Sequence, residues 1–372
     1  AAHDVEAEGF GGEAGADFVV AGLAELREVV RLGLPLPPGK LPPDLLAAHL
    51  DRLAAGDPAV LVPARLGEDV AALDVGGEEV LVVHGDPVTL TGHEAAAWAV
   101  RVNLNDLAVS GARPRWLLAT VLLPPGTTAS AALCLLDDLA AAAHADGLAL
   151  VGGHTEVTPV VAQPLVSLTA LGTVARGRLL DKRRVEPGDD LVLTRALAVE
   201  GTALLAVEMA GELRRAGLAE EELAACRALA ATVSVVPEAL AAAAVPGVHA
   251  LHDVTEGGLA AAAAELAAAC GHGLVVDLDA VPVLPETRRV CAALGADPLG
   301  LIGSGSLLAC CRPEATPRLR EALAGLGVAA TVIGRVGEAG AGVAARRRGR
   351  PAPWPRFETD EAARLLAQRR ET

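Results

Sequence analysis

Three carboxylates in the first half of the chain stand where a metal ion could be held. Asp69 comes just before a short apolar run, and Asp86 comes just after another. Asp106 follows Asn105 on the apolar stripe of an expected helix, so a polar pair interrupts a face that should be buried. Mg²⁺ takes oxygen ligands, commonly one or two carboxylates completed by water and phosphate. Asp69, Asp86 and Asp106 are therefore candidate metal ligands, although a buried pair satisfied by backbone also explains Asn105 and Asp106.

A second polar stretch, Gly152-Gly153-His154-Thr155-Glu156, follows an apolar run that ends at Val151. Two glycines let the backbone approach a ligand closely and expose N–H groups to an anion. An imidazole, a hydroxyl and a carboxylate follow in consecutive positions, and Glu156 is a candidate catalytic group. The stretch matches neither the Walker A nor the dinucleotide-binding pattern, so a turn that is merely polar is the alternative.

A third stretch runs from His252 to Gly258, between an apolar run and an alanine-rich helix. Helix N-termini attract anions, and Gly257-Gly258 stands at the mouth of this one. Asp253 is a second candidate catalytic carboxylate, although Asp253 or Thr255 could also be an ordinary helix cap. Lys40 is a lone cation in a proline-rich segment, and by itself it indicates only a solvated lysine.

The elements that must position these residues alternate between strand and helix, which indicates α/β or α+β domains. Gly76-Gly77 marks a hairpin turn, and a capping box at residues 91–94 opens a helix that ends at Gly111. Expected strands are 59–62, 70–73, 80–83, 116–123, 148–151, 165–174, 191–194, 248–251, 274–278, 305–311 and 329–336. Expected helices are 18–32, 44–53, 92–110, 128–145, 201–210, 220–231, 237–244, 258–270, 286–294, 317–326 and 361–368.

The basic segment 176–184 is the expected domain junction. We predict an N-terminal extension at 1–32, of which the first 16 or so residues are mobile, and a first domain at 33–175. A second domain follows at 176–338, and the remaining residues, 339–372, form a polar tail.

Composition limits the function classes. The chain has 372 residues and a net charge of −16, which argues against nucleic acid because phosphate backbones require a basic face. No apolar run reaches the roughly 18 to 20 uninterrupted residues that span a bilayer, so we expect no membrane segment. Six cysteines without CxxC spacing indicate reduced core residues of a cytoplasmic protein.

Taken together, these motifs resemble the aminoimidazole ribonucleotide (AIR) synthase superfamily, also called PurM-like, in the branch nearest the hydrogenase-maturation protein HypE. The resemblance covers residues 40–336, and the most specific piece is Asn105-Asp106-Leu107-Ala108 with Ser110-Gly111-Ala112 and Pro114. The segments 67–71, 86–87, 152–156 and 252–258 match in order and spacing.

This resemblance implies a two-domain fold whose N-terminal domain forms a β-barrel across a homodimer, with a C-terminal α/β domain. It implies ATP in a groove of the dimer and Mg²⁺ held at Asp69, Asp86 and Asp106. Residues near the nucleotide would be Lys40, Asn105, Gly152, Gly153, His154 and Thr155. Members use ATP to activate an amide-type oxygen of a small-molecule substrate, or to phosphorylate a small molecule directly, chemistry that depends on positioning and charge neutralisation.

This sequence departs from the family pattern at two places, which affect the expected metal ligands and the expected reaction. The usual Gly-Gly-Asp-Thr turn reads Gly-Gly-His-Thr here, so His154 replaces a potential metal ligand. The last cysteine is Cys311, so we expect no HypE-type dehydration of a C-terminal cysteine carboxamide. The main hypothesis is an ATP- and Mg²⁺-dependent enzyme that activates an amide or carbonyl oxygen. The alternatives are a kinase of the thiamine-monophosphate kinase type and a non-catalytic ATP-binding partner of a maturation complex.

Overall fold

The structure is a computed structural model that describes residues 3–4, 19–20, 41–50, 57–88, 95–340 and 342–371. It contains two compact units, Ala1–Pro42 and Pro43–Thr372. In the first unit, β1 (His3–Asp4) pairs antiparallel with β2 (Val19–Val20). The expected helix at 18–32 is therefore wrong at residues 19–20, where pairing with another strand overrides helical periodicity. The rest of the helix expected at 18–32 lies outside the described residues. Lys40 and the capping box at 91–94 also lie outside them.

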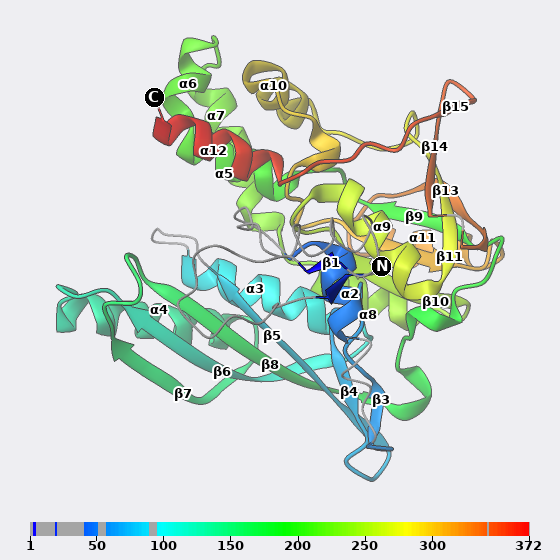
Figure 1. The fold of residues 1–372 in the computed structure, drawn as a ribbon, viewed down its shortest axis with the longest axis horizontal. Coiled ribbons are helices and arrows are strands. Elements are labelled where there is room, and N and C mark those ends of the chain that lie inside the picture. The colour runs from blue at the N-terminus through cyan, green and yellow to red at the C-terminus, as the bar shows by residue number, and fades with distance from the viewer. Residues whose placement is uncertain are drawn as a thin grey trace. The chain divides into compact units, whose positions relative to one another are not determined.

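The second unit begins with α2 (Pro43–Leu50) and contains a six-stranded sheet (Figure 1). The strand order is β3 (Val60–Val62), β4 (Ala71–Leu73), β5 (Glu79–Val88), β8 (Leu165–Ala175), β6 (Arg113–Leu123) and β7 (Ala149–Val157). Neighbouring strands are antiparallel except for the parallel pair β6–β7. A parallel pair needs a crossover, which α4 (Ala129–Ala145) supplies after the N-cap Thr128.

Helix α3 (Ala95–Ala108) packs on β5 and β8 and also contacts elements of the second sheet. Its buried residues Ala96, Val100, Leu104 and Leu107 recur at steps of three and four, which produces one apolar face. The helix is followed by Gly111 at φ +81°, a conformation that favours glycine. The opposite side of α3 is thereby free to present polar residues between the two sheets.

The second sheet has seven strands and follows the first along the chain. Their order is β10 (Val248–Asp253), β12 (Leu307–Cys311), β9 (Asp190–Thr194), β13 (Ala330–Ala339), β11 (His272–Asp277), β14 (Val343–Arg347) and β15 (Arg350–Ala352). Its helices are α5 (Val199–Glu208), α6 (Ala210–Arg215), α7 (Glu220–Ala228), α8 (Val236–Ala243), α9 (Gly258–Cys270), α10 (Pro285–Leu294), α11 (Thr316–Ala324) and α12 (Glu361–Glu371). Short 3₁₀ turns include η3 (Lys182–Arg184) and η4 (Leu229–Thr232).

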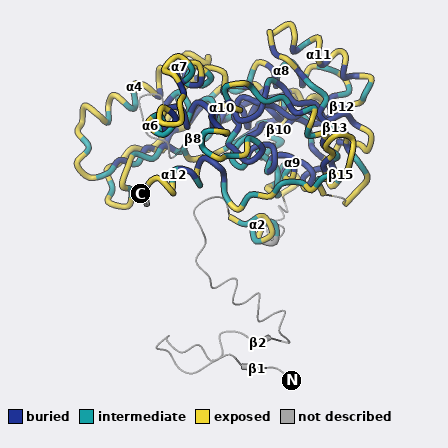
Figure 2. Tube along the Cα trace, turned by 90° about the horizontal axis from the view of Figure 1, so that it is seen from above, coloured by how far each residue is buried: buried dark blue, intermediate teal, exposed yellow. Residues whose placement is uncertain are grey.

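Aliphatic cores hold this unit together, and one of them is shared by the end of α3 and the second sheet. Ala108 and Val109, at the end of α3, pack with Val192 of β9 and Leu251 of β10 in a single buried cluster. Strands β9, β10 and β12 of the second sheet are largely buried, whereas β15 is exposed (Figure 2). The shared core fixes α3 against β10, and these two elements carry Asp106, His252 and Asp253.

No single helix among the described residues has the length and apolarity to cross a membrane, although the bent pair Glu220–Thr232 and Val236–Ala243 passes that test on length and composition. All six cysteines are free, and every one except Cys134 is buried.

Candidate functional site

Asp69 lies in a loop that is pressed directly against helix α9. A Cβ added at Gly67 would lie 2.2 Å from the carbonyl oxygen of Glu265, and Gly67 has a φ of +77°. Glycine is therefore required at this position by the close approach as well as by the backbone conformation. The loop continues through Asp69 into β4, so Gly67 brings the carboxylate of Asp69 to the second sheet.

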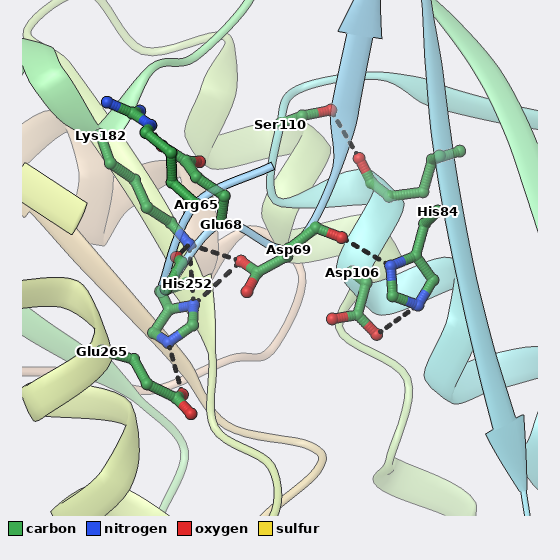
Figure 3. A network of polar contacts seen from close by, with 11 residues as sticks. Arg65, Glu68, Asp69, His84, Asp106, Ser110, Lys182, His252 and Glu265 are labelled. Atoms are coloured by element: carbon green, nitrogen blue, oxygen red, sulfur yellow. Dashed lines mark hydrogen bonds and ion pairs between the residues drawn. The ribbon is translucent and has the colours of Figure 1, made fainter. Parts of the chain in front are cut away.

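Two polar side chains meet at the carboxylate of Asp69, and a third, Glu265, contacts one of them (Figure 3). Lys182 Nζ donates to Asp69 Oδ2 at 2.7 Å and to the carbonyl oxygen of Gly67 at 2.5 Å. His252 Nδ1 lies 2.9 Å from the same Asp69 oxygen and 3.1 Å from Lys182 Nζ. The far ring nitrogen of His252 lies 3.3 Å from Glu265 Oε2 on α9. Residues from the first sheet, the connecting segment and the second sheet thus form one buried network.

The network shifts the pKa values of its members in opposite directions. Burial alone raises the pKa of Asp69, but the positive charges of His252 and Lys182 outweigh it and hold that pKa well below its usual range. Burial lowers the pKa of His252, whereas the Asp69 carboxylate and the hydrogen bonds to Asp69 and Glu265 raise it to about 9. At neutral pH the cluster therefore contains an ionised Asp69 beside two cations.

His84 connects Asp69 to Asp106. Its Nδ1 lies 2.6 Å from the Asp69 carbonyl oxygen, which can only accept, so Nδ1 carries the proton. Its Nε2 faces Asp106 Oδ2 at 3.4 Å. Asp106 is 9% exposed on α3 and lies off the apolar face formed by Ala96, Val100, Leu104 and Leu107. The structure thus brings Asp69 and Asp106 to the same region through one imidazole.

Asp253 ends β10 and completes the group of acids. It is 1% exposed, and its Oδ2 has no hydrogen-bond partner among the residues that the structure describes. Burial raises the pKa of Asp253 well above its usual range, and the negative charges of Asp106 and Asp69 raise it further. A buried acceptor without a partner costs about 1–3 kcal/mol, so this position favours a bound cation or a proton.

The donor set fits a divalent cation. Ligand atoms of Asp69, His252 and Asp253 all lie within 4.8 Å of one another, and Asp106 is close enough to influence Asp253. Carboxylate oxygens are the ligands that Mg²⁺ prefers. Asp86 lies in β5 with an exposed side chain, and its backbone N–H donates to Asn103 Oδ1 at 3.1 Å. The structure therefore groups Asp69 and Asp106 with Asp253, whereas the role of Asp86 as a ligand stays a prediction.

The side chain of Asn105, which we expect near the nucleotide, hydrogen-bonds to the protein backbone. It is fully buried, its Nδ2 donates to the carbonyl oxygen of Val233 at 2.8 Å, and its Oδ1 accepts from the N–H of Val235 at 2.8 Å. Both ends of the amide are thus occupied by the backbone that precedes α8. The alternative of a buried polar group satisfied by backbone therefore describes Asn105, and a nucleotide contact by this residue stays a prediction.

The expected glycine-rich turn is in fact part of a strand. Residues 152–156 continue β7, which pairs in parallel with β6 through Val157. Gly153 allows this pairing, since a Cβ there would lie 1.8 Å from the carbonyl oxygen of Ala119. His154 and Glu156 are exposed, with His154 Nε2 3.2 Å from Glu156 Oε2. Within one chain, Gly152, Gly153, His154, Thr155 and Glu156 therefore form an exposed sheet edge that is separate from the acid cluster.

Sequence reasoning missed three residues of the network: Lys182, His252 and Glu265. Lys182 was assigned only to the basic domain junction, and His252 only to the motif around Asp253. Two features of the sequence could have pointed to Lys182 and Glu265. Lys182 is one of two lysines in the chain, and Glu265 is a carboxylate within the otherwise apolar helix at 258–270.

Comparison with solved structures defines the class of protein. A structure described as the hydrogenase maturation protein HypE in complex with ATP has a TM-score of 0.64 and 25% identity, covering 87% of this chain and 97% of that one. A thiamine-monophosphate kinase from Stenotrophomonas maltophilia has a TM-score of 0.60 and 26% identity, covering 82% of this chain and 96% of that one. The two sheets and their helices therefore form a two-domain PurM-like α/β fold, as the resemblance implied.

Sequence comparison gives the family. The model described as AIR synthase related protein, N-terminal domain, matches residues 67–174, and the corresponding C-terminal domain model matches residues 186–346. A carbamoyl dehydratase HypE from Rhodobacter capsulatus is 35% identical over 286 residues, covering 75% of this chain and 79% of that protein. The chain belongs to the AIR synthase-related family.

Proposed function

We propose that this protein is an ATP- and Mg²⁺-dependent enzyme that activates an amide or carbonyl oxygen of a small molecule by phosphoryl transfer. The observation that carries the proposal is the convergence of Asp69, Asp106 and Asp253 at one place between the two sheets. Relatives described as carbamoyl dehydratase, and a related HypE structure that contains ATP, support the nucleotide and the type of chemistry.

Asp69, Asp106 and Asp253 are the residues that would hold the metal, with Asp86 as a further candidate. A bound Mg²⁺ neutralises phosphate charge during transfer of the γ-phosphoryl group. The chain itself positions the candidate ligands. Gly67 and His84 fix Asp69, and the shared core fixes α3, which carries Asp106, against β10, which carries Asp253. In the transfer, the bond from the γ-phosphorus to ADP breaks and a bond to the acceptor oxygen forms.

The exposed edge strand β7 supports a nucleotide groove that two copies complete. Val151 and Val157 are 56% and 57% exposed, which is unusual for apolar residues on a sheet edge whose backbone groups can pair. We propose that a second copy covers this edge and brings Gly152 to Glu156 next to the nucleotide. Lys40, His154 and Thr155 are candidate nucleotide contacts in that arrangement, and Glu156 is a candidate catalytic group.

A plain small-molecule kinase is the second candidate, favoured by the likeness to thiamine-monophosphate kinase. Product analysis separates the two reactions, because a kinase yields ADP and a stable phosphorylated product, whereas amide activation ends with ADP and free phosphate. A non-catalytic ATP-binding role in a maturation complex predicts tight ATP binding with no turnover of any candidate substrate.

Calorimetry with a non-hydrolysable ATP analogue and Mg²⁺ tests the proposal. We expect Asp106→Asn to abolish binding or weaken it at least tenfold, because it removes the charge while keeping the shape of the side chain. Glu321→Gln, which makes the same chemical change on the exposed face of α11, is the matched control and should bind like the wild type. Undiminished binding by a folded Asp106→Asn variant would refute the proposed site.

A further inference from the structure

Lys182 is an unusual residue in this chain. The sequence contains two lysines, Lys40 and Lys182, against 29 arginines. Lys182 is only 5% exposed although it belongs to η3, a short turn in the basic segment between the two sheets. Its neighbours Arg183 and Arg184 are exposed. A buried cation in a solvent-facing turn indicates a specific role for its charge.

The ammonium group of Lys182 is held in the way that a small cation is held. It donates to two acceptors, the Gly67 carbonyl oxygen and Asp69 Oδ2, and lies 3.1 Å from His252 Nδ1. Asp69 and His252 belong to the same group of potential metal ligands as Asp253. The lysine charge and a metal ion would therefore compete for the Asp69 oxygen.

One carboxylate of this cluster has a cationic partner in the structure, and another has none. Lys182 pairs with Asp69 Oδ2, yet Asp253 Oδ2 stays buried without a hydrogen-bond partner among the described residues. A divalent cation placed between Asp69 and Asp253 would satisfy both carboxylates, but it would stand against the Lys182 ammonium. Two cations at such short range repel strongly where burial removes the screening by water.

We propose that Lys182 is the resident counter-ion of the metal site and that an entering divalent cation displaces its ammonium group. This inference rests on the proposed function, because it assigns the metal to the same carboxylates. Lysine suits the role better than arginine, since a compact point charge on a flexible stem can leave without disturbing its neighbours.

The structure leaves room for this exchange. A surface hollow lined by Glu68, Asp69, Val109, Ser110, Lys182 and Leu251 adjoins the buried ammonium. Because η3 lies in the segment that joins the two sheets, release of Lys182 also frees that segment from Asp69. Metal binding is thereby coupled to the connection between the sheets.

The first test measures Mn²⁺ binding without nucleotide, by calorimetry, in the wild type and in Lys182→Met. Methionine keeps most of the side-chain volume and removes the competing charge, so we expect at least tenfold tighter binding of Mn²⁺. Arg183→Met removes a neighbouring exposed charge that pairs with Asp181 and is the control, with affinity unchanged. Equal or weaker binding by folded Lys182→Met would overturn the proposal.

The second test uses the wild type and does not depend on whether the variant folds. Reductive methylation read by mass spectrometry reports on only two lysines, with Lys40 as the internal reference. Mn²⁺ should raise the modification of Lys182 relative to Lys40 several-fold, because the displaced ammonium becomes accessible. Unchanged or reduced modification at saturating Mn²⁺ would overturn the proposal.

A parallel titration of the wild type with Mg²⁺ and the ATP analogue separates this inference from the proposed function. Absence of nucleotide binding would refute the proposed function and remove the basis of this inference. A wild type that binds the nucleotide, together with a Lys182→Met variant that binds Mn²⁺ no more tightly, would overturn the counter-ion role alone.

Discussion

Asp69 Oδ2 and His252 Nδ1 lie 2.9 Å apart although 183 positions separate the two residues along the chain. Asp69 precedes β4 in the first sheet, and His252 belongs to β10 in the second. Their contact therefore requires that both sheets are folded and docked. The candidate site consequently depends on the relation between two sheets, and neither sheet contains it alone.

The raised pKa of His252 predicts a pH-dependent contribution to stability. A group whose pKa is about 9 when folded and about 6.5 when unfolded stabilises the protein fully below pH 6.5, and this contribution disappears as pH rises through 9. His252 therefore contributes about 3 kcal/mol to the free energy of unfolding at low pH, since each pKa unit corresponds to about 1.4 kcal/mol. Urea unfolding at pH 6 and at pH 9.5 should show this loss in the wild type, and the loss should be absent in His252→Gln.

The exposed His144 on α4 supplies the control for this pH experiment. His144→Gln should keep the pH dependence of the wild type. An identical slope of stability against pH in the wild type and His252→Gln would show that His252 does not gain a proton on folding.

Gly67→Ala should disrupt the approach of the Asp69 loop to α9. The added Cβ would meet the Glu265 carbonyl oxygen at 2.2 Å, and the φ of +77° disfavours alanine. We expect a loss of unfolding free energy on the order of 3 kcal/mol together with weaker metal binding, measured by thermal unfolding and calorimetry.

Gly126→Ala is the matched control, because Gly126 has a φ of +92° and no atom within 4 Å of the added Cβ. The Gly126→Ala variant should lose only about 1 kcal/mol of unfolding free energy, because only the backbone conformation disfavours alanine there, and its metal binding should be unchanged. Equal losses of stability in the two variants would contradict the close approach at Gly67.

Trp98→Phe should destabilise the contact between α3 and α5. Trp98 Nε1 donates to Glu200 Oε1 at 2.8 Å, and Glu200 is 2% exposed, so burial raises its pKa. Removing the donor leaves a buried carboxyl oxygen with one partner fewer, at a cost of about 1–3 kcal/mol in chemical denaturation. Trp116→Phe, which changes a ring stacked under Arg115 instead, should cost less than about 1 kcal/mol.

The exposed edge of β7 predicts the state of association. We expect two copies in solution by light scattering, with Val151→Glu and Val157→Glu together producing a monomer, since charges on an edge strand oppose pairing. Val207→Glu, at a similarly exposed valine on α5, should leave the dimer unchanged. A monomeric wild type would contradict the expected barrel across two subunits.

Local patterns predicted most of the secondary structure, because hydrophobic periodicity and turn residues are local properties of the chain. The helix expected at 258–270 is α9 itself, Gly258–Cys270, and most other elements lie within a few residues of their expected bounds. Local reasoning failed where strand pairing determined the structure. Gly152 to Glu156 was expected as a turn, and β14 and β15 lie in residues 339–372, which were expected to form a polar tail without strands.

The candidate site was predicted only in part, for a related reason. Asp69, Asp106 and Asp253 were identified by their positions at strand ends or on an apolar stripe, and the structure brings them together. The partners of Asp69 could not be identified, because Lys182 and His252 reach it from 113 and 183 positions away. Asn105 shows the converse limit, since an amide on a buried face fits a ligand and a backbone contact equally well.

A crystal structure with Mn²⁺ and a non-hydrolysable ATP analogue tests the central claim most directly. The anomalous signal of Mn²⁺ locates the metal independently of the model that is fitted to the density. We predict a peak at coordination distance from carboxylate oxygens of Asp69, Asp106 and Asp253, with the γ-phosphate equivalent beside it. A nucleotide bound with its metal away from these three residues would contradict the account.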